Sequence, residues 1–102
     1  MEEIKKSIVF DLDGTICHNR TWEEKSYMGL QPHKDMVELI QQLKKDGYEI
    51  VIHTARNMVT QNGDIGKVVA NVGLDTINWL NEHNIPYDSL VFRKTIQFIT
   101  IY

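Results

Sequence analysis

Three short hydrophobic runs alternate along the chain with two segments of helical periodicity. The runs cover residues 4–10, 48–53 and 89–92 and are rich in the β-branched and aromatic residues that favour strands. Hydrophobic residues recur at helical spacing within residues 33–45 and 74–83. The order strand, helix, strand, helix, strand is typical of parallel βαβ units. We therefore predict an α/β fold, a three-layer Rossmann-like domain with a mainly parallel sheet.

Each predicted helix should bury one face against that sheet. The face of the first helix is expected to hold Met36, Leu39, Ile40 and Leu43. The face of the second is expected to hold Leu74, Ile77 and Leu80. Residues 16–31 have no clean periodicity and are predicted to form a short flap that acts as a minimal cap. Its Trp22, Tyr27 and Met28 either line a site or cover the core, and we favour the second interpretation slightly.

Composition places the chain among ordinary globular domains. Its 102 residues suggest a single domain over residues 1–102, and its net charge of −3 argues weakly against non-specific binding of nucleic acid. The single cysteine, Cys17, excludes an intrachain disulfide and is expected to be a packed side chain. No hydrophobic stretch approaches the roughly 20 residues that span a bilayer, so a cytoplasmic location is expected.

The segment Asp11-Leu12-Asp13-Gly14-Thr15 follows the first hydrophobic run directly. The carboxylates of Asp11 and Asp13 would point to the same side if the backbone stayed extended. Thr54 and Lys94 also follow predicted strands, and the carboxyl ends of parallel strands meet at one edge where ligands bind. These residues are therefore expected to form one site.

Such a site suits a phosphate monoester. Asp11 could attack phosphorus and form an acyl phosphate, while Asp13 protonates the leaving oxygen and later deprotonates water. An anion attacking a dianion needs charge neutralisation, which Mg²⁺ and the Lys94 ammonium would supply. The Thr54 hydroxyl can donate to a phosphate oxygen.

These residues resemble the haloacid dehalogenase superfamily, whose signature is a hydrophobic strand followed by Asp-x-Asp-Gly-Thr. The stretch Ile52-His53-Thr54-Ala55-Arg56-Asn57-Met58 is similar to small phosphatases linked to capsular polysaccharide biosynthesis in bacteria. The resemblance implies a nucleophile and Mg²⁺ ligand at Asp11, and an acid/base that binds metal through its backbone carbonyl at Asp13. It also implies phosphate contacts from Thr54, Ala55 and Lys94. A small phosphorylated metabolite, such as a sugar phosphate, is the implied substrate.

Three further residues are candidates for contacting that substrate. His18 lies close in sequence to the two carboxylates, Arg56 follows the second strand, and Lys67 lies in a segment that resembles the same phosphatases. For each, a solvated or structural role is the alternative. Small-capped members of the superfamily often complete their sites by oligomerising, so a homo-oligomer is also expected.

The chain departs from the superfamily pattern near its C-terminal end. Arg93-Lys94-Thr95 stands where Gly-Lys-Pro is usual, and no Asp or Glu follows Asp88 to complete a Mg²⁺ site. A shifted reading frame would explain this atypical tail, residues 95–102, and a natural variant or a deliberately shortened chain is the alternative. The uncharged β-branched and aromatic residues of the tail favour association. Two alternatives to a hydrolase therefore stay open: a phosphate-binding or oligomer-forming remnant without catalysis, and a phosphotransferase.

Overall fold

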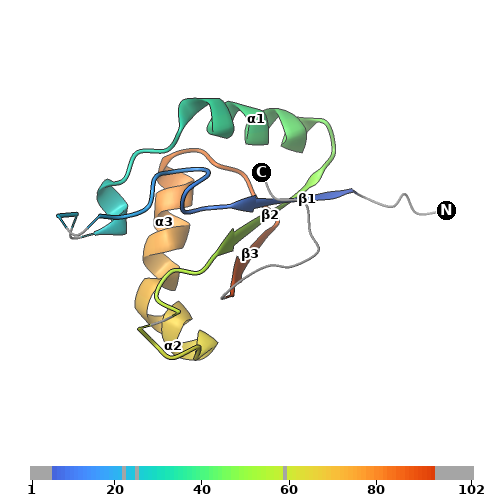
Figure 1. Cartoon of the computed structure of the whole chain (residues 1–102). Coiled ribbons are helices and arrows are strands. Elements are labelled where there is room, and N and C mark those ends of the chain that lie inside the picture. The colour runs from blue at the N-terminus through green and yellow to red at the C-terminus, as the bar shows by residue number, and fades with distance from the viewer. Residues whose placement is uncertain (1–5, 22, 25, 59, 94–102) are drawn as a thin grey trace.

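Three parallel strands form the centre of the molecule. A computed structural model describes residues 6–93 except 22, 25 and 59. Strands β1 (Ser7–Asp11), β2 (Glu49–Thr54) and β3 (Ser89–Phe92) pair in the order β1-β2-β3, all parallel (Figure 1). The predicted α/β fold with a parallel sheet is confirmed, and β3 has the bounds expected from the sequence.

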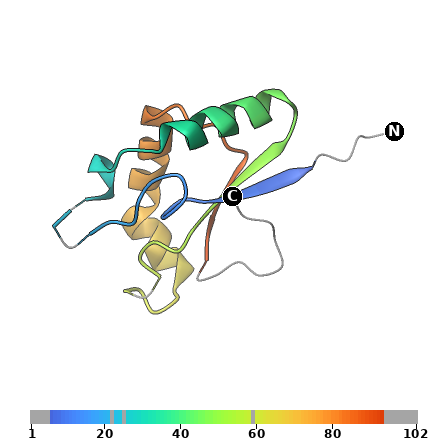
Figure 2. The same ribbon diagram turned by 45° about the horizontal axis from the view of Figure 1, so that its top comes forward.

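Helices connect the strands in two βαβ units. Helix α1 (Lys34–Lys45) joins β1 to β2. Between β2 and β3 the chain forms α2 (Ile65–Val68), a π-helical turn η2 (Val69–Gly73) and α3 (Leu74–Glu82), one directly after another. A 3₁₀ turn η1 (Tyr27–Gly29) lies in the segment before α1. Figures 1 and 2 show α3 on the side toward which the strands point, and α1 across the top of the sheet.

Both long helices bury side chains in the same core. Phe10 of β1 and Ile52 of β2 are register partners, and their side chains cluster with Ile40 of α1 and with Trp79 and Leu80 of α3. Side chains of neighbouring parallel strands at paired positions share a face, so the described helices cover one face of the sheet. A third layer on the other face is not among the described residues, and that part of the prediction stays untested.

The buried faces of the helices differ from the sequence expectation. Leu74 is 70% exposed, Ile77 is 38% exposed and Leu39 is 41% exposed, so their predicted burial was wrong. In α3 the inner face is formed by Thr76, Trp79 and Leu80. Val68, Val72 and Thr76, which follow one another at intervals of four residues through α2, the π-helical turn and α3, are all buried.

The segment before α1 is fastened at both ends. Cys17 forms isolated bridges with Asp13 and Pro32, and the backbone N–H of His33 donates to the carbonyl of Ile16 at 2.6 Å. Leu30 is fully buried, and its carbonyl accepts a hydrogen bond of 2.8 Å from the indole N–H of Trp79. The expected short flap is therefore anchored on the core, while Trp22 lies outside the described residues.

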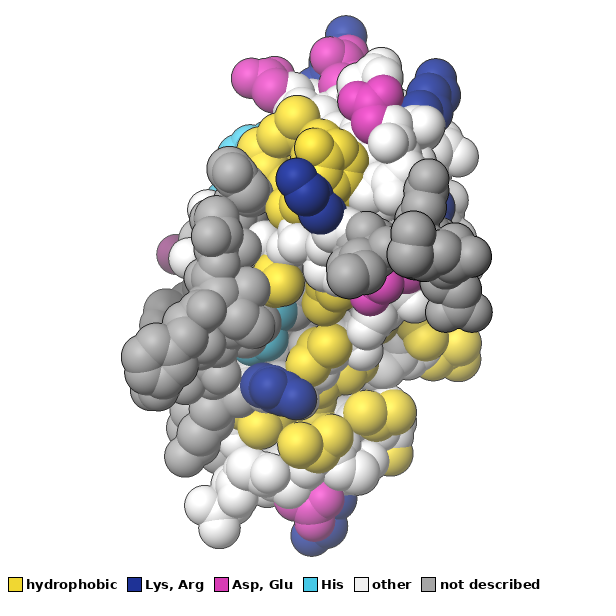
Figure 3. Space-filling model, turned by 90° about the vertical axis from the view of Figure 1, so that its right-hand side faces the viewer, with side chains coloured by type: hydrophobic (Ala, Val, Ile, Leu, Met, Phe, Trp, Pro, Cys, Tyr) yellow, Lys and Arg dark blue, Asp and Glu magenta, His cyan; other side chains and the backbone are white. Residues whose placement is uncertain are grey.

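The surface is uneven in charge. Figure 3 shows acidic and basic side chains near the end where α1 lies, around a group of hydrophobic side chains, with more hydrophobic side chains lower on this face and a second group of charges at the opposite end. Within the described part of the chain, no helix has the length and apolar character needed to cross a membrane.

Candidate functional site

The backbone turns sharply after β1. The N–H of Leu12 still pairs with His53 of β2 at 2.8 Å, but the N–H groups of Ile16 and Cys17 both donate back to the carbonyl of Leu12. Gly14 has a φ of +92°, a conformation that glycine adopts without strain. The chain therefore turns back between Leu12 and Cys17, and the Asp11 and Asp13 carboxylates have different partners. That both carboxylates point to one side stays a prediction.

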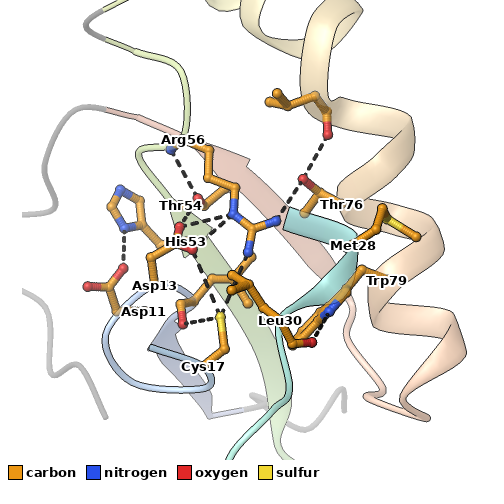
Figure 4. A network of polar contacts seen from close by, with 12 residues as sticks. Asp11, Asp13, Cys17, Met28, Leu30, His53, Thr54, Arg56, Thr76 and Trp79 are labelled. Carbon is orange, nitrogen blue, oxygen red and sulfur yellow. Dashed lines mark hydrogen bonds and ion pairs between the residues drawn. The ribbon is translucent and has the colours of Figure 1, made fainter. Parts of the chain in front are cut away.

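Asp13 accepts hydrogen bonds from Thr54, the last residue of β2, and from Arg56, which follows it. The Thr54 hydroxyl donates to its Oδ2 at 2.8 Å, and Nε of Arg56 lies 2.9 Å from Oδ1 and 3.2 Å from Oδ2. The backbone N–H of Arg56 donates to the Thr54 hydroxyl oxygen at 3.1 Å. Figure 4 shows Asp13, Thr54 and Arg56 turned toward one another. The candidate acid/base is thus held by hydrogen bonds from another strand.

The Arg56 guanidinium is almost fully enclosed, with 1% of its side chain exposed. It lies over the Tyr27 ring at 4.1 Å, and Nη1 donates to the hydroxyl of Thr76 in α3 at 3.4 Å. Nη2 lies 3.8 Å from Sγ of Cys17. Because a buried cation is costly unless it is paired, the Asp13 carboxylate is what makes this position tenable.

Asp11 lies apart from that network and is more open. Its side chain is 39% exposed, and Oδ1 lies 3.4 Å from Nδ1 of the buried His53, its register partner in β2. Nε2 of His53 lies 3.2 Å from the carbonyl oxygen of Arg93, just after β3. An exposed carboxylate at the carboxyl end of a parallel strand is well placed to meet a ligand.

Cys17 is packed against the network. Burial raises the pKa of its thiol to about 11, the nearby Asp13 carboxylate adds to the rise, and the Arg56 guanidinium opposes it. A thiol of this kind is protonated at neutral pH and unreactive. The prediction that Cys17 is a packed side chain is confirmed.

The donors for a metal are few within the described range. Residues 6–93 without 22, 25 and 59 hold no group of three or more His, Cys, Asp or Glu side chains that could bind a metal ion. Asp11 offers one hard oxygen ligand, which fits Mg²⁺ but does not form a site alone. Mg²⁺ commonly keeps several waters and shares substrate phosphates, and those would have to complete its shell here.

The other residues singled out from the sequence are spread over the molecule. Thr54 is fully buried, whereas Ala55 beside it is exposed. Lys94 lies outside the described residues, although the N–H of Arg93 before it donates to the carbonyl of Thr54 at 3.0 Å. Lys67 is an exposed residue of α2.

His18 is likewise exposed and has a partner of its own. Its Nε2 lies 2.9 and 3.0 Å from the two carboxylate oxygens of Glu24. Hydrogen bonds from the Thr21 backbone and from His18 hold the pKa of Glu24 below its usual range. His18 therefore belongs to a small surface cluster within the insert.

Two residues of the site were not expected from the sequence. His53 contacts Asp11, and Thr76 contacts Arg56 from α3. His53 could have been found from strand register, because it precedes Thr54 in β2 and pairs with the last residue of β1. Thr76 carries no comparable signal in the sequence.

Comparison with known proteins places this geometry in a family. The model of the polynucleotide kinase PNKP phosphatase domain matches residues 5–98. A crystal structure of a target protein from Vibrio cholerae is 35% identical, covers 89% of this chain and 72% of that one, and superposes with a TM-score of 0.80. One chain of the Pnkp1/Rnl/Hen1 complex is similar in fold, with 18% identity, a TM-score of 0.63, and coverage of 95% of this chain and 31% of that one.

No curated protein gives a significant match. The fold and these similarities define a phosphatase domain of the haloacid dehalogenase type, whose general activity is phosphoester hydrolysis. Within that class, the chain belongs to the family of polynucleotide kinase PNKP phosphatase domains.

Proposed function

We propose that the chain is a Mg²⁺-dependent phosphomonoester hydrolase that acts through an aspartyl-phosphate at Asp11. The observation that carries this proposal is the arrangement at the end of β1: an exposed Asp11 carboxylate and, two residues further along, a second carboxylate, Asp13, held by Thr54 and Arg56. One carboxylate is open to a substrate, and the other is fixed as a proton carrier. Hydrolysis in two steps needs one group as the nucleophile and another as the acid and base.

Proton and bond changes follow directly. In the first step an Asp11 oxygen forms a bond to phosphorus, the bond from phosphorus to the leaving oxygen breaks, and that oxygen takes the proton from Asp13. In the second step Asp13 takes a proton from water, which attacks phosphorus and releases inorganic phosphate and the free Asp11 carboxylate. Asp11 and the Asp13 carbonyl would hold Mg²⁺, which would neutralise part of the charge on the phosphoryl group.

The substrate class we propose is a small phosphorylated metabolite, such as a sugar phosphate of capsular polysaccharide biosynthesis. A polynucleotide with a phosphorylated end is the second candidate, which the family match favours. The net charge of −3 argues only weakly against it, because nucleic-acid backbones are bound through local clusters of basic residues. Parallel assays with sugar phosphates and a 3′-phosphorylated oligonucleotide distinguish the two.

Turnover of an aryl phosphate with and without Mg²⁺ tests the activity itself. Asp11→Asn should lower kcat by about a thousandfold or more and abolish the phosphoenzyme seen by mass spectrometry. Asp35→Asn is the matched control, since Asp35 is an exposed carboxylate in the first turn of α1. Activity that survives Asp11→Asn would refute the nucleophile.

A catalytically silent remnant is the third reading. It is favoured by the absence of a three-ligand metal group within residues 6–93, gaps at 22, 25 and 59 aside. Folded wild-type chain that binds inorganic phosphate without any Mg²⁺-dependent turnover would establish it. Association into a homo-oligomer stays a prediction, which sedimentation over a range of concentrations tests.

A further inference from the structure

Arg56 contacts more of the site than any sequence pattern indicated. Its guanidinium pairs with Asp13 through Nε, reaches α3 at Thr76 through Nη1, and lies face-on to Tyr27 of the insert. These contacts come from the turn after β1, from α3 and from η1. A side chain with 1% exposure has little room to meet a substrate from solvent.

We propose that Arg56 is a positioning residue, which holds the Asp13 carboxyl group in the orientation needed to pass its proton to the leaving oxygen. The inference rests on the proposed function and extends it to a residue for which a substrate contact was the first expectation. Arg56 takes no part in bond making. Its role is to hold the Asp13 carboxyl group through directed hydrogen bonds.

The geometry of the pair supports this role. Nε approaches both carboxylate oxygens, at 2.9 and 3.2 Å, while Thr54 donates to Oδ2 at 2.8 Å. Donors from two side chains therefore restrict rotation of the carboxyl group about its last torsion angle. Asp13 keeps 17% of its side chain exposed, so the residue is still in contact with solvent.

The guanidinium is itself immobilised. The Thr76 hydroxyl accepts from Nη1 at 3.4 Å and donates to the carbonyl of Val72 at 2.7 Å in the π-helical turn η2. The Tyr27 ring covers the guanidinium at 4.1 Å, a cation–π contact that favours a planar cation. Lysine could keep the charge at this place but could not make all these directed contacts.

The dependence of kcat/KM on the leaving group distinguishes the positioning of Asp13 from other roles of Arg56. A poor leaving group such as phenol needs a proton from Asp13, whereas para-nitrophenol leaves more readily as an anion. If Arg56 positions Asp13, Arg56→Gln should lower kcat/KM for phenyl phosphate by about 100-fold. For para-nitrophenyl phosphate the loss should be at least about tenfold smaller.

The ratio of the two kcat/KM values is measured on one protein sample. Partial misfolding lowers both values equally, and so does the loss of a contact with the substrate phosphate, so neither changes the ratio. Arg56→Lys, a milder change, should give an intermediate ratio. Asp13→Asn should change the ratio in the same direction and at least as much as Arg56→Gln, because it removes the proton donor that Arg56 positions.

Arg20→Gln is the matched control. Arg20 also lies over the Tyr27 ring, at 4.9 Å, but it is exposed and donates to the carbonyl of Glu24. This variant should keep the wild-type ratio. An unchanged ratio in both Arg56 variants, alongside a changed one in Asp13→Asn, would overturn the positioning role alone. Wild-type chain inactive on both substrates would overturn the proposed hydrolase and this inference with it.

Discussion

His53 and Asp11 are register partners in adjacent parallel strands, and Nδ1 of His53 lies 3.4 Å from Oδ1 of Asp11. Nε2 of the same ring lies 3.2 Å from the carbonyl oxygen of Arg93. A carboxylate and a carbonyl both accept, so both contacts are hydrogen bonds when both ring nitrogens carry protons. The middle strand thereby connects the candidate nucleophile to the chain beyond β3.

Replacing this histidine should impair the nucleophile without affecting the leaving group. We expect His53→Leu to lower kcat by about 10- to 100-fold, because Asp11 loses the neighbour that orients it. The ratio of kcat/KM between phenyl and para-nitrophenyl phosphate should stay at the wild-type value. His53→Asn, which can retain an N–H near the position of Nδ1, should be less impaired. Equal losses in both variants would contradict an orienting hydrogen bond.

Helix α3 offers a direct test of which face is buried. Leu80 is fully buried and Leu74 is 70% exposed. Leu80→Ala should lower the free energy of unfolding by about 2–5 kcal/mol, since it leaves a cavity in the core. Leu74→Ala should change it by less than about 0.5 kcal/mol. Urea titrations of both variants measure the difference, and similar losses at the two positions would contradict the observed face.

The sequence specified the strands and long helices well because their periodicity is local. Strand β3 and helix α1 were found within about a residue of their bounds. The meeting of Asp11 and Thr54 at one edge followed from parallel topology alone, and the register of β1 and β2 bears this out. The bounds of these elements and the parallel topology of the sheet could thus be predicted from the pattern of hydrophobic residues.

What escaped prediction depends on contacts between distant residues or on irregular backbone. The pairing of Arg56 with Asp13 joins positions 43 residues apart, and nothing in either local pattern indicates it. The four-residue α2 and the π-helical turn after it are too short to show a period. The buried face of α3 differs from the expectation because the exposed Leu74 and Ile77 share the helical spacing of the buried Leu80, whereas the polar Thr76 lies in the core.

The Cys17 thiol should resist labelling until the chain unfolds. Burial, with Asp13 nearby, raises its pKa from 9.0 to about 11, so little thiolate exists in the folded state at pH 8. Reaction with a disulfide reagent should be slow in buffer and rapid in urea. Fast labelling of the folded chain would show that Cys17 is accessible.

The raised pKa of Cys17 makes the free energy of unfolding depend on pH in the alkaline range. The unfolded thiol ionises first, because its pKa is lower than that of the folded state, so the stabilisation is complete below about pH 9 and is lost as pH rises toward 11. Cys17→Ser should lack this component. Urea titrations between pH 8 and 11 should therefore show the wild-type chain losing more stability than the variant, and parallel curves would contradict the shift.

Thr54 has one hydroxyl proton and two candidate acceptors for it. In the structure the proton goes to Oδ2 of Asp13 at 2.8 Å, whereas the family resemblance assigns it to the substrate phosphate. If the hydroxyl turns to phosphate on binding, Thr54→Val should weaken competitive inhibition by inorganic phosphate about fivefold or more, the loss expected for a hydrogen bond to a charged group.

Thr54→Ser keeps the hydroxyl and is the matched control for that measurement. It should retain near wild-type phosphate affinity while losing about 1 kcal/mol of stability through its missing methyl group, because the Thr54 side chain is fully buried. Thr54→Val should also lose stability, since the backbone N–H of Arg56 donates to this hydroxyl oxygen at 3.1 Å and would be left unpaired. Unchanged phosphate inhibition in a folded Thr54→Val variant would mean that the hydroxyl stays on Asp13 throughout the reaction.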